Sequence, residues 1–244
     1  MSSYTRALSA EWLKLARSRL WLQILLCIAA STLLGILDGR EVGAFRWERT
    51  LTTMSILHAM LFLPIMTGVF SAMVCRYEHA GGGWKQLLVL PVSRGAVYLS
   101  KFSVVCILLA VIQLLFLGGL LLVGVVNRYA EPIPWGMLLQ CLAGGWIACL
   151  PLAALQLAVS TAWSSFAAPL ALNVVFTIPN MLVANSATYA PYYPWAQPLL
   201  AMMPTGGADF GAFNLPFESL MLVVVGGFLL FFMAGLLYFQ RKEI

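Results

Sequence analysis

Long apolar runs separated by short polar stretches dominate the pattern of this chain. A helix that crosses the hydrocarbon of a bilayer needs roughly 20 mostly apolar residues. Six runs approach that length, at about 20–37, 54–75, 102–126, 136–160, 165–185 and 219–239. The pattern therefore predicts an all-α integral membrane protein with six transmembrane helices in a single transmembrane domain, residues 1–244.

Composition and length agree with this class. The chain is 61% hydrophobic and 9% charged, whereas a soluble domain usually carries about 25% charged residues. A length of 244 residues leaves little room for a soluble nucleotide-binding or catalytic domain. The five cysteines fall in or beside apolar runs without the spacing of a metal site, which predicts small buried side chains.

The positions of the basic residues predict the orientation. With the N-terminus inside, ten of the fourteen lysines and arginines fall in cytoplasmic segments and four fall in outer segments. Such a bias marks the cytoplasmic side of a membrane protein. We therefore expect both termini in the cytoplasm, and we read the net charge of +5 as a topology signal rather than a nucleic-acid surface.

The segment that precedes the first apolar run, residues 1–19, has a helical pattern of its own. Leu8, Trp12 and Leu15 repeat at helical spacing, while Lys14 and Arg17 lie elsewhere on the helical wheel. This pattern predicts an amphipathic helix in the inner interface of the membrane. The alternative is a basic flank that only orients the first span.

The predicted spans contain no Asp, Glu, Lys or Arg. Ion-coupled carriers usually keep an ionisable group near mid-membrane. His58 is the one candidate in these spans, and we interpret it as a hydrogen-bonded structural histidine. HExxH and GxSxG motifs are also missing from the sequence, so we predict neither catalytic nor metal-binding residues.

A long segment at 186–218, expected on the outer side, lacks lysine and arginine but holds five prolines and seven aromatic residues. Each proline removes a backbone donor and interrupts a helix. We expect a broken structure that is partly re-entrant or lies on the surface, because Trp and Tyr favour the membrane interface. A lid over an exit path and an aromatic anchor for the last spans are both open interpretations.

The inner loop contains the stretch HAGGGWKQLL, residues 79–88, which superficially resembles a phosphate-binding loop. A P-loop needs GxxxxGK[ST] after a strand. Here Trp84 precedes Lys85, Gln86 follows it, and the stretch comes after a membrane span. We therefore expect the chain to bind no ATP, magnesium or other cofactor itself.

The same loop, the cytoplasmic segment 76–101, predicts a short amphipathic helix. Gly81 to Gly83 permit a turn, and Trp84, Leu87 and Leu88 then fall on one helical face. Pro91 ends this helix, and Ser93 is placed to cap the next one. We expect an exposed Trp–Leu–Leu face at the inner mouth of the bundle, suited to lipid headgroups or to a soluble partner.

The sequence EHAGGGWKQLLVLPVSR with YLSK behind it, within residues 78–101, resembles the type-2 ABC exporter permeases. The branch it is most similar to is that of the lantibiotic-immunity and bacitracin-resistance permeases. The matching positions are Glu78, Trp84, Lys85, Leu87, Leu88, Leu90, Pro91, Ser93, Arg94 and Lys101.

This resemblance implies that the segment between the second and third spans is a coupling helix that docks on a cytoplasmic ABC ATPase subunit. The Trp84–Leu88 face would supply the apolar anchor, and charged neighbours would orient it. The implied docking residues are Glu78, Gly83, Trp84, Lys85, Leu87, Leu88, Pro91 and Arg94.

The resemblance further implies an exporter of two ATPase subunits and two permeases, identical or homologous, in the bacterial cytoplasmic membrane. ATP and magnesium would be bound by the ATPase, and the substrate would be an antimicrobial peptide or another amphipathic compound. The main alternative is a membrane-binding or scaffold protein that works without an ATPase, and an intramembrane enzyme centred on His58 is a third.

Overall fold

A computed structural model describes residues 3–16, 18–39, 45–79, 83–89, 92–204 and 216–242 of the chain. Regular structure in these ranges is entirely helical, which confirms the predicted all-α class for the described residues. The elements in chain order are α1 (Ser3–Ala16), α2 (Leu20–Asp38), α3 (Arg46–Leu57), η1 (His58–Phe62), α4 (Leu63–His79), α5 (Gly83–Val89), α6 (Arg94–Val126), α7 (Trp135–Ala148), α8 (Leu150–Ala162), α9 (Ala167–Thr177), α10 (Asn180–Ala184), η2 (Ala190–Tyr192), α11 (Gln197–Met202) and α12 (Phe217–Arg241).

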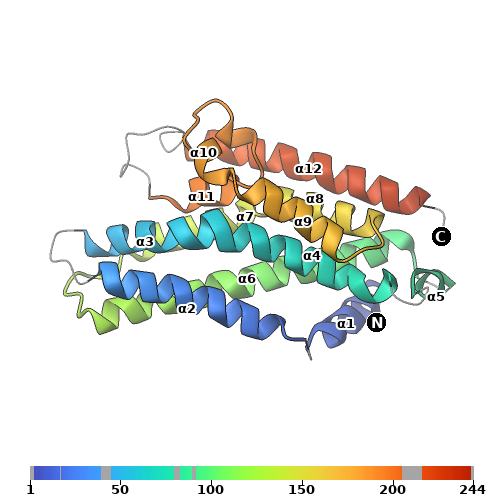
Figure 1. Ribbon diagram of the computed structural model, residues 1–244, viewed down its shortest axis with the longest axis horizontal. Coiled ribbons are helices and arrows are strands. Elements are labelled where there is room, and N and C mark those ends of the chain that lie inside the picture. Colours follow the sequence, from blue (N-terminus) through green and yellow to red (C-terminus); the bar gives the residue numbers. More distant parts are fainter. Residues whose placement is uncertain are drawn as a thin grey trace.

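Five helical stretches in the described ranges are long and apolar enough to cross a membrane. Each overlaps a predicted span, and the stretches are Leu20–Asp38, Arg46–His79, Arg94–Val126, Trp135–Ala162 and Phe217–Arg241. The second combines α3, η1 and α4, and the fourth combines α7 and α8. The long helices form an elongated bundle (Figure 1), in which α6 packs against α1, α2 and α4. The chain is thus a multi-pass membrane protein.

The sixth predicted span, 165–185, is divided into two short helices. α9 has 11 residues, a length of about 16 Å at 1.5 Å per residue, whereas the hydrocarbon core is about 30 Å thick. Pro179 has no backbone N–H and cannot extend the hydrogen-bond ladder of α9, so α10 begins anew at Asn180. The predicted count of six continuous spans is therefore not confirmed.

The second long stretch contains a π-helical turn, η1, and Pro64 is the second residue of α4, which follows it. Because Pro64 lacks an N–H, the carbonyl of Met60 loses the donor that an α-helix would provide. The side-chain amide of Asn180 donates to this carbonyl over 2.9 Å and to the carbonyl of Trp195 over 2.8 Å. The break between α9 and α10 thus places an amide where the π-helical turn needs a donor.

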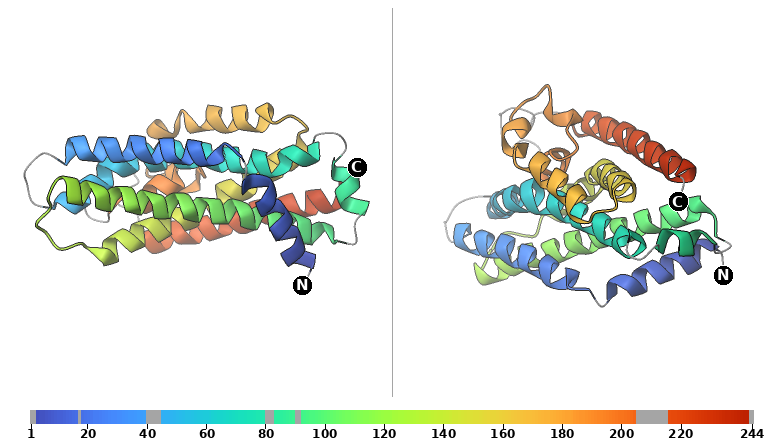
Figure 2. Two further views of the ribbon diagram at one scale, coloured as in Figure 1. Left: turned by 90° about the horizontal axis from the view of Figure 1, so that it is seen from below. Right: turned by 45° about the vertical axis from the view of Figure 1, so that its right-hand side comes forward.

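α1, α5 and the C-terminal end of α12 gather at one end of the bundle, which we call the α5 end (Figure 1). α1 lies obliquely to the long helices (Figure 2) and packs against α6. Leu15 is buried and Leu8 packs on the core, while Trp12 is exposed. The interfacial position of this helix and the cytoplasmic location of the α5 end stay predictions.

The described part of the segment 186–218 contains two short elements, η2 and α11. α11 packs against α7 with its residues buried, so this proline-rich stretch enters the helical bundle. Residues 205–215 lie outside the described part of the chain. The roles of lid and of aromatic belt both stay predictions.

Candidate functional site

α5 lies close against the end of α4 because Gly83 has no side chain. A Cβ at Gly83 would approach the carbonyl oxygen of Tyr77 to 2.8 Å and Cα of Glu78 to 2.9 Å. Backbone atoms cannot yield to such a contact as a flexible side chain can. Glycine at this position therefore permits the short helix to rest on the helix before it.

Trp84 joins α5 to the rest of the bundle. Its side chain is buried, and its ring packs against Phe239 of α12 with the centroids 5.2 Å apart. The indole Nε1 donates a hydrogen bond to Nδ1 of His79 over 3.1 Å. Ammonium groups of Lys101 and Lys242 lie 5.5 and 5.8 Å from the ring centre, within the range of cation–π attraction.

His79 connects Trp84 to the end of α8. An indole N–H can only donate, so Nδ1 of His79 is the acceptor; a carbonyl can only accept, so Nε2 donates to the carbonyl of Ser160 over 2.7 Å. These two partners assign the neutral Nε2–H tautomer. The histidine thereby links α5 and α8 through one rigid ring.

Arg94, in the first turn of α6, binds the C-terminal end of α12. Its Nη1 donates to the carbonyls of Gln240 and Lys242 over 2.9 and 2.8 Å. The last carbonyls of a helix have no partner within the helix and carry partial negative charge, so a guanidinium stabilises them. Ser93 accepts a hydrogen bond from the amide of Ala96, which confirms its predicted capping role.

Four charged residues form a ring that is buried except at Lys14, and we call it the charge quartet: Glu11, Lys14, Glu78 and Lys101. Lys14 pairs with Glu11 at 2.9 Å and with Glu78 at 2.6 Å. Lys101 lies 3.0 Å from each of the same two carboxylates and also donates to the carbonyl of Val74. Each charge thus contacts two of opposite sign, and the four sum to zero.

This alternation compensates for burial. The Lys101 side chain is fully buried and the carboxylates are nearly so, and a lone charge there would be costly. Burial by itself lowers the pKa of Lys14, but the charges and hydrogen bonds of Glu11 and Glu78 outweigh that effect, so the pKa lies above its ordinary value. The quartet joins α1, α4 and α6 at the place where α5 is attached.

The opposite side of α5 faces outward. Lys85 and Gln86 are exposed, and Val89 is 86% exposed, although it is an apolar residue. Leu87 is half-buried and packs at the edge of the core. α5 therefore presents an exposed face with one positive charge, one amide and one apolar tip.

The structure corrects the expected exposed Trp–Leu–Leu face, because Trp84 is buried against the bundle. Glu78 is also buried, in the charge quartet, and Arg94 is occupied with the end of α12. Pro91 and the side chain of Leu88 lie outside the described part of the structure. The docking role inferred for these residues stays a prediction.

Sequence reasoning missed His79 and Phe239 as partners of Trp84, and Glu11 and Lys14 as members of the charge quartet. An ion pair between Glu11 and Lys14 could have been predicted, since opposite charges three residues apart share a helical face. Nothing local indicated that Lys101 would meet Glu11, because the two are 90 residues apart in the chain.

His58 lies elsewhere, in η1. Its Nε2 is 3.2 Å from Oε1 of Gln113, and its ring stacks on Phe116 with the centroids 4.2 Å apart. The structure thus supports the interpretation of a hydrogen-bonded structural histidine. Its Nδ1 has no hydrogen-bond partner among the described residues.

Comparison with curated proteins finds no match to the chain. Residues 7–180, well over half of the chain, match the family described as ABC-2 family transporter protein. The matched region extends from α1 into α10 and includes α5 and the charge quartet. The chain belongs to the ABC-2 transporter family, and it is a membrane transport subunit.

Proposed function

We propose that this chain is the membrane-spanning permease of an ATP-driven exporter and that a separate cytoplasmic ABC ATPase docks on α5. The observation that carries the proposal is the two-sided construction of α5. One side is fixed to the bundle through Trp84, and the other presents Lys85, Gln86 and Val89 to the surroundings. A helix that must receive force from a soluble partner needs both a free face and a firm attachment.

The docking roles divide between the two sides of α5. Val89 is the apolar contact, and Lys85 supplies an orienting charge at the rim, in line with the general division between buried anchors and rim charges in interfaces. Trp84 and Glu78 do not contact the ATPase. They hold α5 in place, Trp84 by packing on the bundle and Glu78 by its ion pairs at the end of α4. Gly83 permits the close approach to α4 on which that position depends.

Force on α5 reaches three long helices at once. Trp84 touches α12 through Phe239, α4 through His79 and α6 through Lys101. Packed interiors are nearly incompressible, so a shift of the indole moves its neighbours. ATP-driven closure of two ATPase subunits on a pair of permeases, identical or homologous, then reshapes the path between the bundles.

The substrate class we propose is a cationic amphipathic compound such as an antimicrobial peptide. Its support is a pocket of about 340 Å³ at the end opposite α5. The lining combines aromatic and apolar surface with two carboxylate residues, and consists of Phe45, Trp47, Glu48, Glu131, Pro132, Pro134 and Met137. Acidic groups among aromatic rings suit a ligand that carries positive charge on an apolar body.

The proposal is tested by co-purification of the full chain with the ATPase of its transporter and by the ATPase activity of the complex. Val89→Glu is expected to abolish co-purification and stimulated hydrolysis without changing the melting temperature of the chain alone, because the residue is exposed. Val125→Glu, which changes a valine of similar exposure in the last turn of α6, away from α5, is the matched control.

Retained binding and stimulation in Val89→Glu would reject docking at α5. A chain that performs its cellular role with no ATPase present would reject the exporter and favour the scaffold alternative. Trp84→Ala is expected to lower both stability and stimulation, since it removes the attachment rather than the contact.

A further inference from the structure

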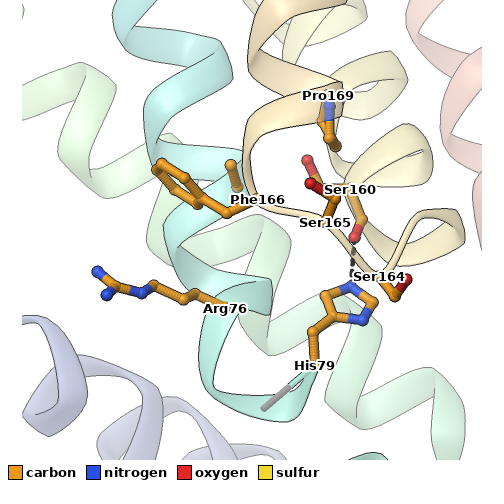
Figure 3. A pocket seen from close by; sticks show the side chains of 8 residues that line it. Arg76, His79, Ser160, Ser164, Ser165, Phe166 and Pro169 are labelled. Atoms are coloured by element: carbon orange, nitrogen blue, oxygen red, sulfur yellow. Dashed lines mark hydrogen bonds between the residues drawn. The ribbon is translucent and has the colours of Figure 1, made fainter.

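A pocket of about 190 Å³ opens at the α5 end, between the last turn of α4 and the turn that joins α8 to α9 (Figure 3). Figure 3 shows Arg76 extending away from the three serines of the wall toward Phe166, so its charge does not face them. The serine side of the pocket is therefore neutral, and the volume has room for several water molecules at about 30 Å³ each. The serines are Ser160, Ser164 and Ser165.

A row of polar side chains leads from this pocket into the bundle. Ser160 in the pocket wall is 2% exposed, and its Oγ has no hydrogen-bond partner among the described residues. Gln156, one turn earlier on the same face of α8, and Ser71 of α4 are fully buried, and their polar side-chain atoms also lack partners among those residues. These three residues hold four of the twelve such atoms in the described ranges, so the unpaired groups are concentrated here.

The packing of α4 against α8 brings these three side chains to one interface, which we call the α4–α8 seam. The side chain of Thr67 in α4 hydrogen-bonds with that of Cys149, which begins α8, and His79 at the end of α4 donates to the carbonyl of Ser160. The two helices thus run side by side in the same direction. Ser71 lies one turn after Thr67 and about two turns before His79, so it falls between these two contacts.

Gln156 differs from the other buried amides of the described bundle. Amide side chains within membrane bundles usually hydrogen-bond across helices, and each of the others donates to a partner; these are Gln113, Asn173, Asn180 and Gln197. Neither the amide nitrogen nor the oxygen of Gln156 has a partner among the described residues. Buried polar groups that are not bound to protein are generally bound to internal water, because an unpaired one is costly. Gln156 therefore indicates that water reaches about 9 Å inward from the end of α8, at about 1.5 Å per residue.

We propose that the α4–α8 seam is an aqueous inlet, through which water and small polar solutes enter the half of the bundle nearest α5. The pocket is its mouth, and Ser160, Gln156 and Ser71 hydrogen-bond successive water molecules along it. Hydroxyl and amide groups can both donate and accept, so they bind water in either orientation. The inlet is a property of this chain alone and does not depend on the docking of an ATPase at α5.

The test uses the full chain in lipid nanodiscs, with its five cysteines replaced by alanine and one cysteine introduced in the seam. A water-soluble methanethiosulfonate reagent modifies such a thiol where water admits the reagent. Ser160→Cys, Gln156→Cys and Ser71→Cys are expected to react, in that order of decreasing rate. Each should react about tenfold or more faster than Ser100→Cys, since a dry site is reached only during rare local opening. Ser100 is the matched control because it is also fully buried and its hydroxyl donates to the carbonyl of Val97.

Gln156→Leu tests whether the inlet is continuous. Added to Ser71→Cys, it is expected to slow the reaction at position 71 severalfold, because an apolar side chain interrupts the path; added to Ser160→Cys, it should leave the rate unchanged. Ser71→Cys and Ser160→Cys each replace one oxygen by sulfur, so they remain informative even if Gln156→Cys does not fold. Reaction confined to Ser160→Cys would show an isolated pocket, and rates at positions 71 and 156 equal to that of Ser100→Cys would show a dry seam. Either result would overturn the proposal.

Discussion

The ammonium of Lys101 lies 3.0 Å from a carboxylate oxygen of Glu78, and this ion pair joins α6 to the last turn of α4 immediately before α5. The same lysine pairs with Glu11 of α1, so three elements distant in the sequence meet at one buried cation. These ion pairs within the chain therefore fix the end of α4, and with it the starting position of α5, without a partner molecule.

Lys101→Met is expected to destabilise the chain by about 3–5 kcal/mol, since it leaves two buried carboxylates with only one lysine. Adding Glu78→Gln removes the excess negative charge and should restore part of the loss. Thermal or denaturant unfolding in detergent measures both variants. A double variant no more stable than the single one would show that the quartet is not a coupled unit.

The quartet also predicts a dependence on alkaline pH. The pKa of Lys14 is raised in the folded chain by Glu11 and Glu78, which outweigh the effect of burial. A raised pKa contributes stability that is fully present below the unfolded value of about 10.5 and is lost as pH rises through the folded value. Melting temperatures of wild type and Lys14→Met should therefore converge above that range, and a constant difference up to the highest pH would contradict this.

His79→Ala is expected to uncouple α5 from α8 while the exposed face of α5 persists. The substitution leaves the indole N–H of Trp84 and the carbonyl of Ser160 without their present partners, at about 1–3 kcal/mol for each buried group. In the complex with the ATPase, binding should be retained while stimulation falls. Full stimulation in His79→Ala would indicate that force from α5 passes only through Phe239 and Lys101.

Gly83→Ala should destabilise the chain even though alanine is the better helix former by about 1 kcal/mol. The new Cβ would collide with backbone atoms of Tyr77 and Glu78 and move α5 away from α4. Gly95→Ala is the control, because the nearest atom to a Cβ there lies 3.9 Å away. Unfolding temperatures should fall for the first variant and hold or rise for the second.

Asn180→Ala tests whether the side-chain amide of Asn180 stabilises the break between α9 and α10. Its amide donates to the carbonyls of Met60 and Trp195, and the loss of both bonds is expected to cost about 2–4 kcal/mol. Asn185→Ala, at an exposed position just beyond α10, should have little effect. Equal melting temperatures for the two variants would mean that the carbonyl left free by Pro64 finds another donor.

Most of the helices were predictable because the underlying constraint is local. A bilayer demands a minimum apolar length, so α2, α6 and α12 can be read from short windows of sequence. Ser93 was predictable as a cap for the same reason, since its bond reaches three residues along the chain. The interruption at Pro179 shows the limit of this approach, because a predominantly apolar window still predicts a span where a proline divides the helix.

The sequence alone determined that this is a helical membrane protein with a short helix between its second and third spans, and it indicated the ABC exporter permeases. Only the tertiary structure decided which face of that helix is buried, because the answer depends on Phe239 of α12. Likewise, nothing in the sequence pairs Glu11 with Lys101, and only the packing of α1 against α6 places their charged groups 3.0 Å apart. Apolar length and caps are local properties, whereas burial and ion pairing are set by residues that only the fold brings together.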